Sequence, residues 1–154
     1  MGRSLGVHCT PKAAYMAVAE DGVILATGPQ KVDVPDGLRT GSSLAALNEE
    51  LHRRLVEVGA TDGAVLLPQT YDAGSKAAIA RIGLETVLRL VANDLGLEIE
   101  LLNRSTARSR LGIDRSGTLD DRVKQLFPSA IGKYWAEGRR YAAFAALACE
   151  IGAK

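Results

Sequence analysis

Basic side chains that could bind phosphate groups gather in the last third of the sequence. Residues 103–154 hold ten Lys and Arg against five Asp and Glu, and residues 1–102 hold nine against thirteen, so differences of +5 and −4 give the net charge of +1. Cationic side chains bind the phosphates of nucleic acids in a way that depends on salt and not on base sequence. The candidate residues for this contact are Arg104, Arg108, Arg110, Arg115, Arg122 and Lys124.

The same cations also fit an interpretation without any ligand. Asp114, Asp120 and Asp121 lie among them in the sequence, so part of the positive charge can be neutralised by ion pairs on a hydrated surface. Arg104 and Arg108 are four residues apart and can share one helix face in either case. The charge pattern therefore leaves a nucleic-acid interface and a solvated surface both open.

The cysteines and histidines are too scattered to indicate a metal site or a disulfide framework. Cys9 and Cys149 lie at opposite ends of the chain, and His8 and His52 are far apart. Structural zinc sites and disulfide-rich folds use closely spaced ligands instead. We expect two reduced core thiols, a surface position for His52, and neither a metal nor a cofactor.

Length and composition favour a single globular domain spanning residues 1–154. A chain of this length can bury a sizeable core, and 47% apolar with 24% charged residues is ordinary for a globular protein. Its apolar runs fall far short of the ~20 residues that span a bilayer, and its N-terminus lacks a signal-peptide pattern. We expect a cytoplasmic protein that does not associate with membranes.

Hydrophobic patterning predicts three strands at the start of the chain. Short apolar runs bounded by turn residues place them at Leu5–Cys9, Ala14–Ala19 and Val23–Ala26. Pro11 marks the first turn, and the Asp21-Gly22 pair is typical of a tight hairpin turn. The third strand can continue into Lys31–Val34 across an irregularity at the Gly28-Pro29 pair.

The remaining elements alternate between helices and strands. Helices are expected at residues 44–58, capped by Ser42 or Ser43, and at 75–93, 105–111, from Thr118 to Pro128, and 134–151, with strands at 63–67 and 97–102. Tight connections make the first three strands antiparallel, and the strand–helix–strand units add parallel strands through right-handed crossovers. The prediction is an α/β fold with a mixed five-stranded sheet, element order βββαβαβαα, flanked by helices.

This element order and several local motifs resemble the RNase H-like fold and, within it, the RuvC Holliday-junction resolvases. Leu5-Gly6-Val7-His8 is similar to their opening Leu-Gly-Ile-Asp, and Pro68-Gln69 aligns with the Glu-Gln that ends their fourth strand. Tyr141-Ala142-Ala143-Phe144-Ala145 resembles their terminal Asp-Ala-Ala-Asp-Ala. Ser105–Arg108 and Arg122–Gln125 resemble the segment that carries their lysine-rich DNA contacts. The resemblance covers most of the chain and implies DNA-backbone contacts by the basic set and a homodimer.

The four positions that carry carboxylates in that family are not acidic in this sequence. They are His8, Pro68, Tyr141 and Phe144. By resemblance, the carboxylates would hold a pair of divalent ions that activate water. Hard ions such as magnesium prefer charged oxygen ligands, which proline and phenylalanine lack and which tyrosine, with a pKa near ~10, supplies poorly. The resemblance therefore implies a nuclease scaffold without nuclease activity.

Two arrangements of these residues remain open. Tyr141 and Phe144 can fill the former metal cleft with apolar bulk beside a half-buried His8, which would leave no pocket. Alternatively, a small-molecule cleft at the carboxyl edge of the sheet can be lined by His8, Cys9, Gln69, Tyr71 and Tyr141.

Three functions are compatible with the sequence. The preferred one is a catalytically inactive RuvC-like protein that binds branched or duplex DNA, or acts as a structural subunit beside it. The second is a homodimeric protein–protein scaffold, because the apolar faces of the helices at 75–93 and 134–151 exceed what one sheet needs. The third is a metal-dependent nuclease or small-molecule enzyme with relocated ligands.

Overall fold

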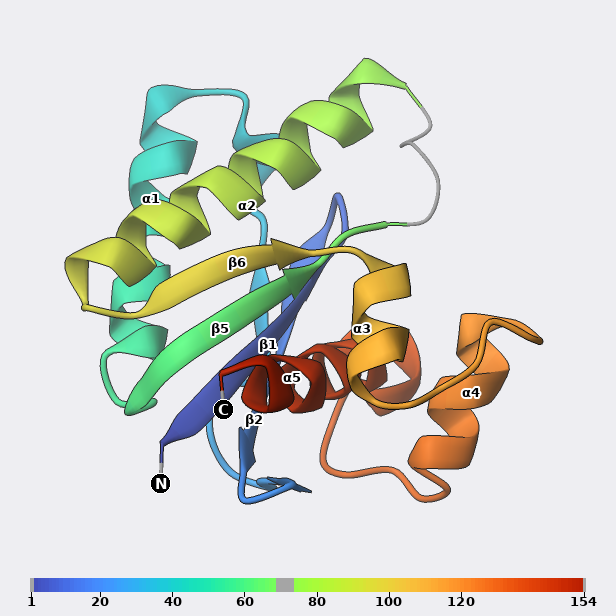
Figure 1. Ribbon diagram of the computed structural model, residues 1–154. Helices are drawn as coiled ribbons and strands as arrows, with labels where there is room; N and C mark the ends of the chain where they lie inside the picture. Colours follow the sequence, from blue (N-terminus) through green and yellow to red (C-terminus); the bar gives the residue numbers. More distant parts are fainter. Residues whose placement is uncertain (1, 69–73, 154) are drawn as a thin grey trace.

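The computed structural model describes residues 2–68 and 74–153, in which helices cover both faces of a mixed six-stranded sheet (Figure 1). The strands are β1 (Arg3–Cys9), β2 (Ala13–Glu20), β3 (Val23–Ile24), β4 (Lys31–Asp33), β5 (Ala60–Leu66) and β6 (Glu98–Leu102). The α-helices are α1 (Gly41–Leu55), α2 (Ser75–Asp94), α3 (Arg104–Arg110), α4 (Leu119–Leu126) and α5 (Arg140–Gly152). None of the helices in these ranges has the length and hydrophobicity needed to cross a membrane.

The sheet has the order β3-β2-β1-β5-β6, and β4 pairs with β2. β1 runs antiparallel to β2 and parallel to β5, and β5 runs parallel to β6. The predicted mixed sheet and order of elements are confirmed. The predicted number of five strands was wrong, because the third strand is interrupted near Gly28, which has a φ of 101°, and its two halves pair separately with β2.

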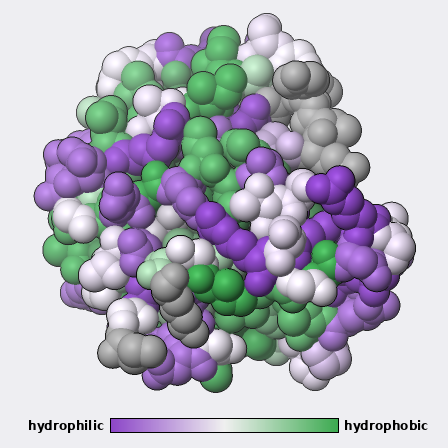
Figure 2. Space-filling view, in the orientation of Figure 1, coloured by the Kyte–Doolittle hydropathy of each residue, from purple (hydrophilic) through white to green (hydrophobic). Residues whose placement is uncertain are grey.

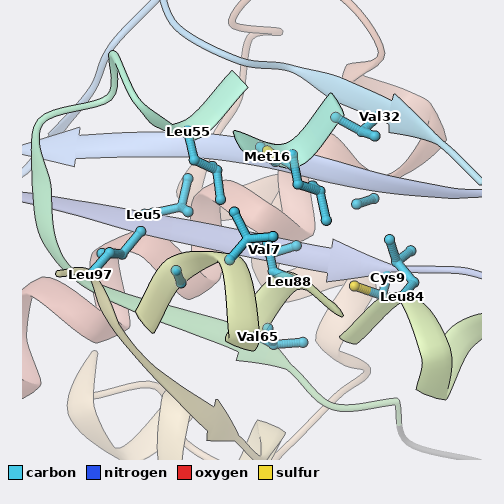
Figure 3. Packing of buried hydrophobic residues seen from close by; sticks show 14 of the residues in the cluster. Leu5, Val7, Cys9, Met16, Val32, Leu55, Val65, Leu84, Leu88 and Leu97 are labelled. Carbon is cyan, nitrogen blue, oxygen red and sulfur yellow. The ribbon is translucent and has the colours of Figure 1, made fainter. Parts of the chain in front are cut away.

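Alternation along β1 divides its side chains between the two faces of the sheet. Leu5, Val7 and Cys9 pack into the core beneath α1 and α2, where Figure 3 shows them beside side chains from β2 and α2. Gly6 and His8 face the other side, which α5 covers. Cys9 and Cys149, which were expected to be reduced core thiols, are buried and do not form a disulfide bond with each other.

Helix α5 lies unusually close to β1. A Cβ atom added to Gly6 would lie 1.9 Å from the carbonyl oxygen of Ala142 and 2.4 Å from the backbone nitrogen of Ala146. Both alanines are fully buried. The helix backbone therefore rests directly on the central strand, which is possible only because the strand has no side chain at this point.

The final helix begins later than predicted. Tyr134 has a left-handed backbone with a φ of 61°, and a π-helical turn, η2 (Trp135–Arg139), follows before α5 starts at Arg140. Gly138 within this turn departs from helical geometry. The first helix was also misjudged at its start, where Thr40, and not Ser42 or Ser43, accepts the capping bond from the Ser43 backbone.

A buried arginine fastens the π-helical turn to the sheet. Arg139 has no exposed surface, and its guanidinium donates to the carbonyl oxygens of Met16 (2.9 Å), Leu25 (3.4 Å) and Ile131. Burial lowers the pKa of this guanidinium below its usual value. The turn is therefore held in one position by backbone acceptors from three separate segments.

Candidate functional site

A row of cross-strand neighbours marks the carboxyl end of β1 on the α5 face. Leu66 of β5 lies opposite His8, His8 lies opposite Tyr15 of β2, and Tyr15 lies opposite Lys31 of β4. Directly opposite residues project from the same face of a sheet, so these four side chains form one line. The line passes through the position of the first expected carboxylate, His8.

Aromatic rings and backbone atoms cover this row of side chains. The ring centroid of Tyr141 lies 5.2 Å from that of His8, and the ring of Tyr15 stacks on His8 at 6.4 Å. A Cβ atom added to Gly138 would lie 2.6 Å from Tyr15 Cδ2 and 3.1 Å from His8 Cδ2. The backbone of η2 therefore lies directly over both rings.

Phe144 fills the neighbouring position over β5. It has no exposed surface and belongs to a core cluster with Ala64 and Leu66 of β5. Two positions of expected carboxylates, Tyr141 and Phe144, are thus occupied by rings directed at the sheet. Cys9 does not face the small-molecule cleft suggested from the sequence, because it packs into the opposite core, and Gln69 and Tyr71 lie outside the described residues.

His8 is electrically neutral in this setting. Burial, together with the nearby Arg104 charge, lowers its pKa from 6.5 to about 4. Its Nδ1 atom is buried and has no hydrogen-bond partner among the described residues. The imidazole therefore acts as a packed ring near neutral pH.

Stability is expected to fall when the pH drops from 6.5 toward 4. The unfolded chain protonates His8 near pH 6.5, whereas the folded chain resists protonation until about pH 4. Above pH 6.5 His8 is neutral in both states and does not reduce the free energy of unfolding. As the pH falls from 6.5 to 4, the unfolded state binds a proton that the folded state does not, and the free energy of unfolding falls by about 3 kcal/mol. Urea denaturation of wild type and His8→Gln at pH 7.5, 6, 5 and 4 measures it, and the difference between the two should change by this amount.

His52→Gln provides the control for this titration. His52 lies half-buried at the surface, with Nε2 3.6 Å from an Asp94 carboxylate oxygen, and it does not touch the row. Its variant should retain the loss of stability that His8 causes between pH 6.5 and pH 4. Parallel curves for wild type and His8→Gln would contradict the role assigned to His8.

Several cations lie against the aromatic rings of the row. The guanidinium carbons of Arg104 and Arg140 lie 5.5 Å and 5.2 Å from the ring centroid of Tyr141, and Lys31 Nζ lies 5.8 Å from that of Tyr15. Within residues 2–68 and 74–153, no three His, Cys, Asp or Glu side chains are grouped so that they could hold a metal ion. A neutral imidazole, a phenol, a proline and a phenylalanine beside these cations do not fit a two-metal site.

The sequence did not indicate that Asp120 lies beside Tyr141. The Tyr141 hydroxyl donates to Asp120 Oδ1 at 2.8 Å, and Arg140 Nη2 and Lys124 Nζ lie 2.5 Å and 3.1 Å from the same carboxylate. These donors lower the pKa of Asp120. The helix predicted from Thr118 to Pro128 places Asp120 in its first turn, but only the packing of α4 on α5 brings it to Tyr141. Both of its oxygens are already held by cations.

Three of the six predicted cations line one pocket. This arginine pocket has a volume of about 640 Å³ and contains Arg104, Arg108 and Arg115, together with Pro68, Ser105 and Leu119. Arg104 joins it to the aromatic row, because its Nε donates to the Leu67 carbonyl at 3.1 Å while its guanidinium stacks on Tyr141. Figure 2 shows hydrophilic residues over this side of the molecule, around α3 and α4.

The other three predicted cations are neutralised elsewhere. Arg110 pairs with Glu100 at 2.5 Å, Arg122 with Asp114 at 3.0 Å, and Lys124 with Asp120 at 3.1 Å. They do not line the arginine pocket. The predicted basic set therefore divides into a pocket group and an ion-paired group.

Comparison of the whole chain with known proteins gives structural matches only. No family model matches the sequence, and no curated protein does. RuvC from T. thermophilus in complex with a Holliday junction substrate superposes with a TM-score of 0.74 and 10% identity, covering 99% of this chain and 95% of that chain. A second Thermus thermophilus RuvC structure gives 0.75 and 12%, covering 98% and 95%.

The chain has the fold of a RuvC resolvase. The yeast mitochondrial Holliday junction resolvase extends the RuvC-like likeness to a second organism, with a TM-score of 0.62, 15% identity, and coverage of 96% of this chain and 77% of that chain. The predicted RNase H-like, RuvC-like fold is thereby confirmed. Identities this low establish the fold alone, so the role of the RuvC-like scaffold in this chain is argued from its own residues.

Proposed function

We propose that this RuvC-like protein binds branched or duplex DNA without cleaving it. The observation that carries the proposal is the double role of Arg104, which stacks on Tyr141 at the former metal position and lines the arginine pocket. A cation at this place opposes a divalent metal ion and attracts a phosphate. Loss of cleavage and retention of binding thus have one physical origin.

The side chains in the row at His8 are poor ligands for the metal ions that cleavage requires. The row at His8 offers a neutral imidazole and the phenols of Tyr15 and Tyr141, whose pKa values are raised by burial. Neither neutral phenols nor an imidazole replace the carboxylates that hold hard divalent ions. Asp120, the carboxylate that accepts from the Tyr141 hydroxyl, is bonded to three donors.

The positive charges that could bind DNA are those of Arg104, Arg108 and Arg115 in the arginine pocket. Arg104 and Arg108 are oriented by backbone carbonyl oxygens and have no carboxylate partner among the described residues. Arg115 is exposed beside them. Guanidinium groups bind phosphate oxygens through pairs of hydrogen bonds, and such contacts do not depend on base sequence.

A four-way junction with 5′-hydroxyl ends is expected to shift in an electrophoretic mobility assay at micromolar protein and low salt. Arg115→Gln should weaken binding several-fold and reduce the salt dependence by about one counterion, because one phosphate contact is lost. Arg53→Gln is the matched control: it removes the same charge from α1, where Arg53 pairs with Glu50. No shift at low salt would end the DNA proposal.

The same junction incubated with magnesium or manganese is expected to stay intact. A chelator control and an active resolvase run in parallel show that the assay detects cleavage. Chelator-sensitive cleavage that disappears in His8→Ala would instead establish a nuclease with relocated ligands.

A homodimeric scaffold is the second candidate, supported by one helix face. Ile79, Ile82 and Leu90 of α2 are 56%, 50% and 62% exposed, and their spacing places them along one side of the helix. Figure 2 shows apolar residues gathered over α2. The expectation that the last helix also offers a spare apolar face was wrong, because α5 is buried against β1, β2 and β5.

Light scattering at high protein concentration is expected to report a dimer if α2 is a self-association face, and Leu90→Glu should convert it to a monomer. The substitution replaces an exposed apolar side chain by a charge, so folding should be unchanged. Val23→Glu, at an equally exposed apolar position on β3, serves as control. A monomeric wild type at every concentration would exclude self-association.

A further inference from the structure

We propose that the arginine pocket binds a terminal phosphate monoester, the dianionic group present at a phosphorylated strand end and on a free mononucleotide. This inference rests on the proposed function and specifies which part of a nucleic acid the pocket takes. Charge, orientation and shape of the pocket support it independently.

The charge of the pocket suits a dianion. Arg104, Arg108 and Arg115 line it, and no carboxylate from residues 2–68 or 74–153 does. The nearby Asp114 carboxylate is bonded to Ser116 and Arg122 and does not line the pocket. A phosphate monoester carries close to two negative charges near neutral pH, whereas each internal phosphodiester carries one. Three guanidinium groups therefore favour the monoester.

Two of the guanidinium groups are held in place before any ligand binds. Arg108 donates to the carbonyl oxygens of Asp114 (3.0 Å) and Gly117 (3.4 Å), and Arg104 donates to that of Leu67 (3.1 Å). Each guanidinium has five N–H donors, so others remain for a ligand. Side chains already ordered lose little entropy on binding. Burial lowers the pKa of Arg104, which means that its charge is partly desolvated and would gain from an anion.

The shape of the pocket suits a single nucleotide. Its volume of about 640 Å³ is within the range of small-molecule sites. Pro68 and Leu119 contribute apolar surface, and Ser105 and Thr106 contribute hydroxyl groups from the first turn of α3. A phosphate on the arginines with its sugar and base against the apolar wall would fill such a pocket.

Fluorescence anisotropy with two otherwise identical overhang duplexes, one 5′-phosphorylated and one with a 5′-hydroxyl, tests the inference. We expect about tenfold tighter binding of the phosphorylated duplex. Arg108→Gln and Arg115→Gln should each remove most of this preference. Arg122→Gln should retain it, because Arg122 is bonded to Asp114 outside the pocket.

Competition by 5′-AMP and by a 5′-phosphorylated oligonucleotide separates the two sources of the monoester. Displacement by both at similar concentrations assigns a free mononucleotide, and displacement by the oligonucleotide alone assigns a strand end. Equal affinity for the two duplexes, or a preference that survives both pocket variants, overturns the inference while leaving the 5′-hydroxyl junction assay to decide the proposed function. Failure of every probe to bind overturns both.

Discussion

Phe144→Asp is expected to leave the protein largely unfolded at room temperature. Phe144 has no exposed surface and packs with Leu66 and Ala64, so the change removes a large apolar side chain and buries a carboxyl group without a partner. Loss of a buried phenylalanine costs about 3–5 kcal/mol, and the unpaired polar group adds about 1–3 kcal/mol. The sum is comparable with the whole stability of many domains. Circular dichroism and urea denaturation measure it.

Two further substitutions control this result. Phe144→Leu keeps an apolar side chain and should cost only about 1 kcal/mol. Tyr141→Asp introduces a carboxylate at another of the four expected positions, which is half-buried beside Arg104 and Arg140, so it should cost less than Phe144→Asp. A stable, folded Phe144→Asp protein would contradict the view that this position has become part of the core.

Gly6→Ala is expected to destabilise the protein by about 3 kcal/mol or more. The new methyl group would lie 1.9 Å from the Ala142 carbonyl oxygen, so α5 must move away from β1 along its length. Overpacking of this kind usually costs about 1–3 kcal/mol, and backbone atoms on a buried helix yield less readily than side chains. The midpoint of thermal or urea unfolding reports the change.

Gly41→Ala is the matched control for the central strand. Gly41 is the first residue of α1, and a Cβ atom there would meet nothing within 4 Å. The same methyl group should be neutral or stabilising by up to about 1 kcal/mol, because alanine is the better helix former. Similar unfolding midpoints for the two variants would show that β1 and α5 are not in the close contact described.

Much of the fold was predictable because its signals are local. The apolar run at Leu5–Cys9, the Asp21-Gly22 turn and the periodicity of residues 75–93 gave elements close to β1, the β2–β3 turn and α2. The aligned motifs also singled out His8 and Tyr141, whose ring centroids lie 5.2 Å apart. These features depend on neighbours in the sequence, which pattern and turn chemistry describe directly.

What could not be predicted depends on contacts between distant segments. The bond from Tyr141 to Asp120 arises only when α4 packs beside α5, and the division of the basic residues depends on partners such as Glu100, ten residues from Arg110 in sequence. The π-helical turn was likewise hidden, because Arg139 stabilises it through carbonyl oxygens more than a hundred residues away. No local pattern encodes such partners.

The close contact between α5 and Gly6 also affects how the chain folds. The central strand is covered by a helix that lies more than 130 residues later in the sequence, and Arg139 can find Met16 and Leu25 only once β2 and β3 are in place. Contacts of such long sequence separation require the closure of large loops and slow the search for the native topology. We therefore expect α5 to dock late in folding, which would leave one face of the central strand exposed to water until then.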